Sequence, residues 1–255
     1  MILRRLGNKA KIAKEIQKYF PSHKIYIEPF FGAGGMFFNK PKAKYNIVND
    51  LDSDVFNLFQ VVMNQKEELE KAFYIMPIHS DLLDYWKVNK ETEPIKKALR
   101  FLFLSNFTLN GTGSAIRGSS TEESYENIER LLTPTYEYLK YVKIFNYHFS
   151  EFFEKISYRR QSEIDGVLIY ADPPYLQTTD NYSHSFTETD STDLFNCLQA
   201  TKCKWAMSEF DNPFILQQAK DRNLNIHIIG ERQNLKNRRT EILITNYQIK
   251  QQSLF

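Results

Sequence analysis

The sequence predicts an α/β fold with a mainly parallel sheet, and three short, largely apolar runs indicate it. They cover residues 25–27, 45–49 and 167–171, and the last contains five apolar residues without a charge. Uncharged runs of this length are typical of strands that are buried on both faces of a parallel sheet. An acidic residue follows each run: Glu28, Asp50 and Asp172. Because ligands of open α/β sheets bind beyond the carboxyl ends of the strands, a functional site is expected at this edge.

A glycine-rich turn follows the first run, in the stretch Glu28-Pro29-Phe30-Phe31-Gly32-Ala33-Gly34-Gly35. Strand, glycine turn and then helix is the layout that brings backbone close to a nucleotide-like ligand. The third glycine of a dinucleotide fingerprint is missing at its usual spacing, which argues against a pyrophosphate site. Asp50 lies 18 positions after Gly32, the usual distance for an acid that binds ribose hydroxyls. An adenosine group without phosphates fits both observations, and a helix N-cap cluster at 50–54 is the alternative interpretation.

The third run ends in the tetrapeptide Asp172-Pro173-Pro174-Tyr175. Two prolines cannot continue a central strand, so the strand stops at the aspartate. The carboxylate and the carbonyl of the first proline can accept hydrogen bonds from one amino group, and the tyrosine ring offers a face on which a planar heterocycle can stack. The alternative is an ordinary turn, since Asp and Pro are common turn residues.

A long insertion separates two of these strand ends. Asp50 and Asp172 are 122 residues apart, whereas one strand-helix-strand unit takes roughly 30. We therefore expect one α/β domain formed by residues 1–60 and 141–255, with an insertion at 61–140. Helical periodicity at 69–73 and 95–107 predicts a mainly helical insertion, which also contains a polar, glycine-rich loop at 110–120.

Composition indicates a soluble globular protein. Of the 255 residues, 42% are hydrophobic and 25% are charged, and no apolar stretch approaches the roughly 20 residues that span a bilayer. The N-terminus carries Arg4 and Arg5 and lacks the apolar core of a secretion signal, so a cytoplasmic location is expected. Cys197, Cys203 and five scattered histidines indicate neither a disulfide framework nor a metal site.

Six stretches, spread over nearly the whole chain, together carry a family resemblance. They are Leu6-Gly7-Asn8-Lys9, Glu28-Pro29-Phe30-Phe31-Gly32-Ala33-Gly34, Asn49-Asp50-Leu51-Asp52, Asp172-Pro173-Pro174-Tyr175, Trp205-Ala206-Met207-Ser208-Glu209 and Thr240-Glu241-Ile242-Leu243-Ile244-Thr245-Asn246-Tyr247. The chain resembles the Dam-like group of adenine-N6 DNA methyltransferases, which use S-adenosylmethionine. The resemblance implies a Rossmann-like methyltransferase sheet with helices on both faces, and it makes the insertion a target-recognition domain.

The resemblance also implies the roles of particular residues. The implied catalytic residues are Asp172, Pro173, Pro174 and Tyr175. The implied cofactor-binding residues are Arg5, Lys9, Glu28, Phe30, Gly32, Gly34, Asp50, His148, Phe149 and Asp172. Two of these depart from the family pattern, because Arg5 stands where an aromatic residue is usual and His148 stands where an acid is common. An arginine plane can still stack on a ring.

Three groups of side chains are candidates for contact with double-stranded DNA. The polar loop of the insertion could read the major groove, where arginine pairs bidentately with guanine; the alternative is a loop without a role. Its candidates are Asn110, Thr112 and Arg117. A loop expected at 177–193 contains Tyr182, which could cover an extruded base or pack on the insertion. A basic cluster just before the last strand could contact phosphates or form a solvated face, and it contains Lys236, Arg238 and Arg239.

The expected reaction requires the target adenine to be rotated out of the duplex. Tyr175 would stack on the base, Asp172 and the Pro173 carbonyl would hold its amino group, and Phe30 would line the region of methyl transfer. No metal is required, and a cognate restriction endonuclease is a possible separate partner. The alternatives are a cytosine-N4 or RNA methyltransferase, a catalytically silent DNA-binding or scaffold protein, and a protein-glutamine methyltransferase, which typically has Asn at the first motif position.

Overall fold

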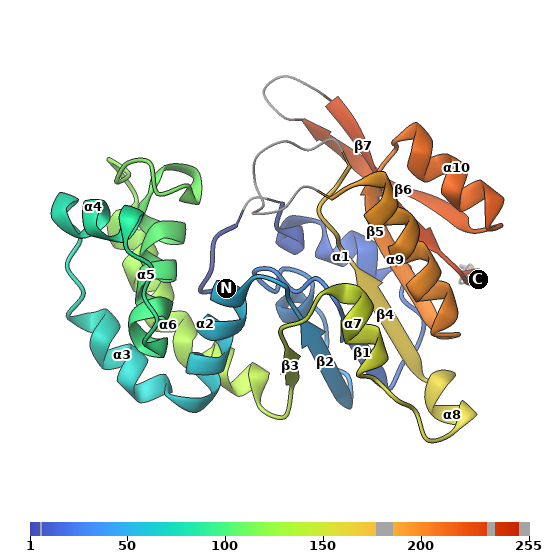
Figure 1. Ribbon diagram of the computed structural model, residues 1–255, viewed down its shortest axis with the longest axis horizontal. Helices are drawn as coiled ribbons and strands as arrows, with labels where there is room; N and C mark the ends of the chain where they lie inside the picture. Colours follow the sequence, from blue (N-terminus) through green and yellow to red (C-terminus); the bar gives the residue numbers. More distant parts are fainter. Residues whose placement is uncertain (6, 177–185, 234–237, 250–255) are drawn as a thin grey trace, which may run out of the picture.

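Seven strands form one mixed sheet among the residues that the computed structural model describes, which are 1–249 without 6, 177–185 and 234–237 (Figure 1). The strands are β1 (Ile25–Glu28), β2 (Tyr45–Asn49), β3 (Lys143–Phe145), β4 (Val167–Ala171), β5 (Lys204–Phe210), β6 (Asn225–Gln233) and β7 (Arg238–Thr245). Their order in the sheet is β3-β2-β1-β4-β5-β7-β6. The first five run parallel, and β7 is antiparallel to both of its neighbours.

The centre of the sheet is the apolar strand β4, in which every residue is buried. It pairs with β1 on one side and β5 on the other, with Ile27 opposite Ile169 in the β1 pair. The chain leaves β1 toward β2 and returns to β4 on the opposite side, so the strand order reverses between β1 and β4. Such a switch point leaves a crevice at the carboxyl ends of the strands, where ligands of this fold class bind.

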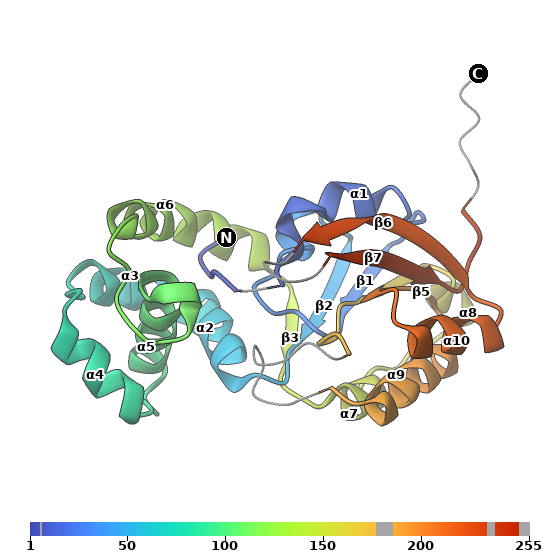
Figure 2. The ribbon, with the colours of Figure 1, turned by 90° about the horizontal axis from the view of Figure 1, so that it is seen from above.

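Helices cover both faces of the sheet, as predicted. Figure 2 shows α1 (Ala13–Gln17) on one face and α7 (Phe149–Glu154), α9 (Glu188–Ala200) and α10 (Pro213–Asp221) on the other, and the short helix α8 (Gln161–Ile164) precedes β4. The alternation along β4 explains this arrangement. Leu168 and Tyr170 pack with α1, whereas Val167 and Ile169 pack with α7, α9 and α10.

Two predicted elements differ from the structure. The helix expected after the glycine turn is only the 3-10 turn η2 (Phe37–Asn39), because Pro41 keeps the preceding Lys40 in an extended conformation. The loop expected at 177–193 ends earlier than predicted, since α9 begins at Glu188. A capping box explains this start: Thr187 accepts from the backbone of Asp190, and the Asp190 carboxylate accepts from the backbone of Thr187.

Five helices lie between β2 and β3, to one side of the sheet (Figures 1 and 2). They are α2 (Ser53–Asn64), α3 (Lys66–Tyr74), α4 (Ser80–Val88), α5 (Pro94–Phe107) and α6 (Thr121–Leu139). The helical periodicity predicted at 69–73 and 95–107 falls within α3 and α5. Helix α5 begins with Pro94 at its first position and the Glu93 carboxylate accepting from the next two backbone N–H groups, a standard N-terminus.

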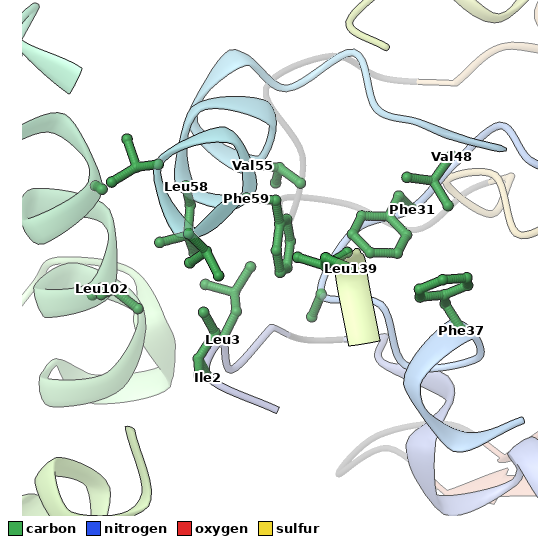
Figure 3. Close-up of a cluster of buried hydrophobic side chains, with 14 of the residues drawn as sticks. Ile2, Leu3, Phe31, Phe37, Val48, Val55, Leu58, Phe59, Leu102 and Leu139 are labelled. Carbon is green, nitrogen blue, oxygen red and sulfur yellow. The ribbon is translucent and has the colours of Figure 1, made fainter. Parts of the chain in front are cut away.

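The helical segment shares its hydrophobic core with the sheet. Leu58 and Phe59 of α2 lie between Leu102 of α5 and Phe31 of the glycine turn (Figure 3). The boundary predicted at residue 61 is therefore not a structural break. It falls inside α2, whose apolar face stays buried as far as Val62.

The N-terminal segment connects the helices to the sheet. Ile2 and Leu3 are buried in the same core, and the Asn106 side chain of α5 donates a hydrogen bond to the Ile2 carbonyl at 3.1 Å. A few residues later the chain forms the turn η1 (Lys9–Lys11) beside the sheet, with the Asn8 side chain capping it. In the part of the chain that the structure describes, no helix has the length and apolar character to cross a membrane.

Candidate active site

A cavity of about 270 Å³ opens at the carboxyl ends of β1, β2 and β4. The glycine turn after β1, the N-terminal segment, the start of α7 and the residues around the start of α9 complete its wall. Nine of the predicted cofactor residues line it: Arg5, Lys9, Glu28, Phe30, Gly32, Asp50, His148, Phe149 and Asp172. Gly34 is not part of the lining. The structure thus brings the aspartate before the double proline and the glycine turn to one cavity.

Two residues of the glycine turn have backbone conformations that residues with a side chain rarely adopt. Gly32 and Gly34 have φ values of 53° and 72°, in the left-handed region. At Gly34 a Cβ would also collide with the ring of Phe38. Gly34 is therefore needed for the packing of the turn against Phe38, and it does not contact the cavity.

Gly35 lines the cavity and was not predicted as a site residue. A Cβ at this position would overlap the Asn8 side chain and lie 2.8 Å from the backbone nitrogen of Lys9. The absence of a side chain lets the N-terminal segment pass directly over the turn. The only sequence signal for this contact was the glycine pair in the turn, and a glycine pair does not show which segment of the chain packs against it.

Asp50 stabilises the turn as well as lining the cavity. Its carboxylate accepts hydrogen bonds from the backbone N–H of Gly32 at 2.5 Å and of Asp52 at 2.9 Å. Burial raises the pKa of Asp50 above its ordinary value, while the charge of Arg5 acts in the opposite direction. The predicted 18-residue spacing thus corresponds to a direct contact between Asp50 and the turn.

Arg5 forms an ion pair with the acid that caps the N-terminus of α2. Its Nη2 lies 2.8 Å from Oδ2 of Asp52, whose other oxygen accepts from the backbone of Asp54 and caps the helix. The guanidinium is therefore anchored to the cavity wall by a charge-assisted hydrogen bond.

Three phenylalanines form an apolar part of the wall. The ring of Phe30 lies 5.7 Å from that of Phe149 and 6.2 Å from that of Phe186, and the last two are 6.0 Å apart. Phe186 was not among the predicted site residues. His148 precedes α7, is exposed, and has Nδ1 2.7 Å from the Ser150 hydroxyl.

Lys9 joins the N-terminal segment to the predicted catalytic motif. Its side chain is only 3% exposed, and its Nζ lies 2.7 Å from Oδ1 of Asp172. Asp172 and Pro174 line the cavity, whereas Pro173 is buried and is not part of the lining. A buried ammonium at this distance fixes the orientation of the carboxylate.

Tyr175 differs from the predicted open stacking platform. Only 8% of the residue is exposed, and its hydroxyl donates to Oε1 of Glu241 at 3.0 Å. Lys9 Nζ lies 4.6 Å from the ring centroid, and Phe210 packs against the ring edge to face at 4.6 Å. The inward position suits tyrosine, because its apolar ring is buried there and its hydroxyl has a hydrogen-bond partner.

Buried carboxylic acids surround this corner. Burial raises the pKa of Glu28 well above its ordinary value although the Tyr26 hydroxyl donates to it at 2.8 Å. Burial likewise raises the pKa of Glu209 on β5 to about 8. Glu209 is therefore mostly protonated at pH 7. Glu241, which contacts Lys9 and Tyr175, was not predicted as a site residue, and the signal for it was an acid at the start of an apolar run. Glu209 is not part of the cavity lining.

The predicted DNA-binding side chains lie in separate regions. Asn110 and Thr112 are exposed on the loop between α5 and α6, where Thr108 and Ile116 form a β-bridge. The Arg117 guanidinium donates to the Ser120 carbonyl at 2.8 Å and to the Ser124 hydroxyl at 2.6 Å, so it is engaged at the start of α6.

The basic cluster before the last strand is described only in part. The Arg239 guanidinium lies over the ring of Phe210, 5.4 Å from its centroid, beside the Tyr175 corner. Tyr182, Lys236 and the side chain of Arg238 lie outside the described residues. Within the described ranges, no group of three or more His, Cys, Asp or Glu side chains could hold a metal ion.

Comparisons with known proteins point to one family. A family model for D12 class N6 adenine-specific DNA methyltransferases matches residues 6–249. The DNA adenine methylase of Salmonella typhi is 26% identical over 200 residues, which cover 72% of this chain and 69% of that protein. The Type II methyltransferase M1.LlaDCHI of Lactococcus lactis subsp. cremoris is 26% identical over 277 residues, which cover 94% and 93%. Among solved structures, the rRNA methyltransferase aviRa of Streptomyces viridochromogenes is 10% identical with a TM-score of 0.43, over 96% of this chain and 89% of that one.

Proposed function

The chain belongs to the family of D12 class N6 adenine-specific DNA methyltransferases, and on that premise we propose that its cavity transfers a methyl group from S-adenosylmethionine to N6 of adenine in double-stranded DNA. One observation carries the assignment of the site. Asp172 of the Asp-Pro-Pro-Tyr corner and Gly32 of the glycine turn line the same cavity, so a methyl donor and a target amine can meet there.

The cavity wall suits the cofactor. Phe30 and Phe149 provide apolar ring surface for the adenosine, and Gly32 allows the backbone to approach it. Asp50 and Asp172 provide carboxylates toward the ribose and the positively charged part of the molecule. When bound, the sulfonium supplies an activated methyl group and its own leaving group.

Asp172 acts on the target amine. Adenine N6 is a poor nucleophile because its lone pair is delocalised into the ring. The Asp172 carboxylate lines the cavity and accepts a hydrogen bond from the amino group, which frees the lone pair and aligns it for transfer. Lys9 contributes by holding the carboxylate in place at 2.7 Å.

The helical segment provides the contact with the target sequence. The helices between β2 and β3 form the target-recognition region, with Asn110, Thr112 and Arg117 as readers on the loop beyond α5. Arg239, whose guanidinium lies over the ring of Phe210, contacts phosphates, and Lys236 and Arg238 remain candidates for the same role from the sequence. The adenine leaves the stack at a cost of a few kcal/mol before it reaches the cavity.

One relative bears on the cellular setting. A Type II methyltransferase among them supports a role in restriction and modification, with the endonuclease as a separate protein. The protein acts in the cytoplasm, where its DNA substrate lies, and its reaction uses no metal.

The test is a methylation assay with product identification. Purified protein is incubated with labelled S-adenosylmethionine and genomic DNA that lacks adenine methylation, and modified bases are then sequenced. N6-methyladenine at a defined site is expected. Methylated cytosine would overturn the proposal in favour of a cytosine-N4 enzyme. If DNA gives no product, the same assay on RNA separates an RNA enzyme, which would label it, from a silent DNA-binding protein, which would not.

Asp172→Ala is the matching variant. It removes the acceptor for the amine and is expected to abolish transfer while leaving the far-ultraviolet circular dichroism spectrum unchanged. Because Lys9 would lose its partner at 2.7 Å, cofactor binding is measured in parallel by calorimetry. Wild-type turnover in this variant would remove Asp172 from the mechanism.

A further inference from the structure

Glu241 is a buried carboxylate that has no role in the mechanism described so far. It lies on β7, opposite Phe210 of β5, and is 1% exposed. Strand β7 lies antiparallel to β5, and this position brings Glu241 next to Tyr175 of the catalytic motif. Burying a carboxylate costs free energy unless charge or hydrogen bonds compensate, so its partners indicate what it does.

Glu241 contacts two residues of the catalytic corner. Its Oε1 accepts from the Tyr175 hydroxyl at 3.0 Å and lies 3.6 Å from Lys9 Nζ. The same ammonium lies 2.7 Å from Asp172 Oδ1. Lys9 is therefore shared between two carboxylates, and the ring of Tyr175 lies beside it at 4.6 Å.

We propose that Glu241 is a positioning residue for methyl transfer, which shares the Lys9 ammonium with Asp172 and so keeps Asp172 a strong hydrogen-bond acceptor for the target amine. This inference rests on the proposed function. A carboxylate whose only counter-ion is a buried ammonium is a weaker acceptor, because its charge is already compensated. The second carboxylate shares that compensation, and its hydrogen bond to Tyr175 fixes its own orientation.

Glu209 provides a matched control on the neighbouring strand. It is also 1% exposed and faces the same corner, but burial raises its pKa to about 8, so it carries little charge at pH 7. Its Oε1 accepts from the backbone N–H of Phe210 at 2.9 Å, a bond that an amide oxygen can also make. Glu209→Gln therefore changes the same chemical group without removing a charge.

The experiment compares Glu241→Gln with Glu209→Gln at pH 7. In Glu241→Gln the Tyr175 hydroxyl still finds an amide oxygen, so the loss of charge is the main change. We expect kcat to fall roughly 10- to 100-fold, the range seen when outer partners of metal ligands are removed. The Kd for S-adenosylmethionine and the melting temperature are expected to stay near wild type, and Glu209→Gln is expected to keep wild-type kcat.

Three results would overturn the inference: a wild-type kcat in Glu241→Gln, an equal loss in Glu209→Gln, or a loss of kcat matched by a loss of cofactor affinity. If Glu241→Gln does not fold, Glu241→Asp replaces it, since the shorter side chain keeps the charge but withdraws it from Lys9, and the same split between kcat and Kd is expected. Wild-type protein is assayed alongside. A silent wild type refutes the proposed function itself, whereas an active wild type with an equally active Glu241→Gln refutes this inference alone.

Discussion

Glu209→Gln is expected to stabilise the protein at neutral pH. Glu209 is almost fully buried on β5, and burial raises the pKa of its carboxyl from 4.5 to about 8, with the nearby charge of Asp172 adding to the effect. The folded protein therefore holds this proton more tightly than the unfolded chain does. Linkage requires that the free energy of unfolding falls as the pH rises from about 4.5 to about 8, because only the unfolded chain releases the proton freely in this range.

The size of the effect follows from the pKa difference. One pH unit corresponds to about 1.4 kcal/mol, so the full range between 4.5 and about 8 amounts to about 5 kcal/mol, of which about 3 kcal/mol is lost by pH 7. A glutamine does not titrate and can still accept from the Phe210 backbone. The variant avoids this loss, and its advantage over wild type should grow with pH up to about 8.

Urea denaturation of both proteins at a series of pH values from 4 to 9 measures this difference. The two free energies of unfolding are expected to converge near pH 4.5 and to separate progressively above it. Titrating groups that do not interact with Glu209 affect both proteins equally and cancel in the comparison. Parallel curves over the whole range would show that Glu209 titrates alike in the folded and unfolded states, and the reasoning from burial would fail.

Two further substitutions test the wall and the recognition loop. Gly35→Ala places a methyl group against Asn8 and the Lys9 backbone, so we expect a loss of about 1 to 3 kcal/mol in urea denaturation together with weaker cofactor binding; a variant with both values unchanged would contradict the close approach. Arg117→Ala removes the donor to Ser120 and Ser124, and a loss of about 1 to 3 kcal/mol is expected. DNA titrations with target and non-target duplexes should show a reduced preference in Arg117→Ala, and an unaltered preference would exclude this side chain as a reader.

The sequence predicted the sheet and the edge at which the site lies. Buried parallel strands have a distinctive local pattern, and a double proline or a glycine turn marks the end of a strand without reference to the rest of the chain. For this reason Asp172 and Gly32 could be assigned to one cavity in advance. The helix expected after the glycine turn was wrong, because Pro41 ends it. The boundary expected at residue 61 falls inside α2, whose buried face continues past it.

The sequence by itself determined which segments end at the functional edge of the sheet, because buried strands and the turns that end them have patterns in neighbouring residues. Only the tertiary structure decided what surrounds Asp172. Lys9, Tyr175 and Glu241 come from three distant parts of the chain, and their contacts arise because β7 inserts antiparallel beside β5 and the N-terminal segment crosses over Gly35. Charge compensation among buried groups depends on distances across the fold, which the sequence does not show. For this reason Tyr175, expected to stack on the base, is a buried hydrogen-bond partner of Glu241.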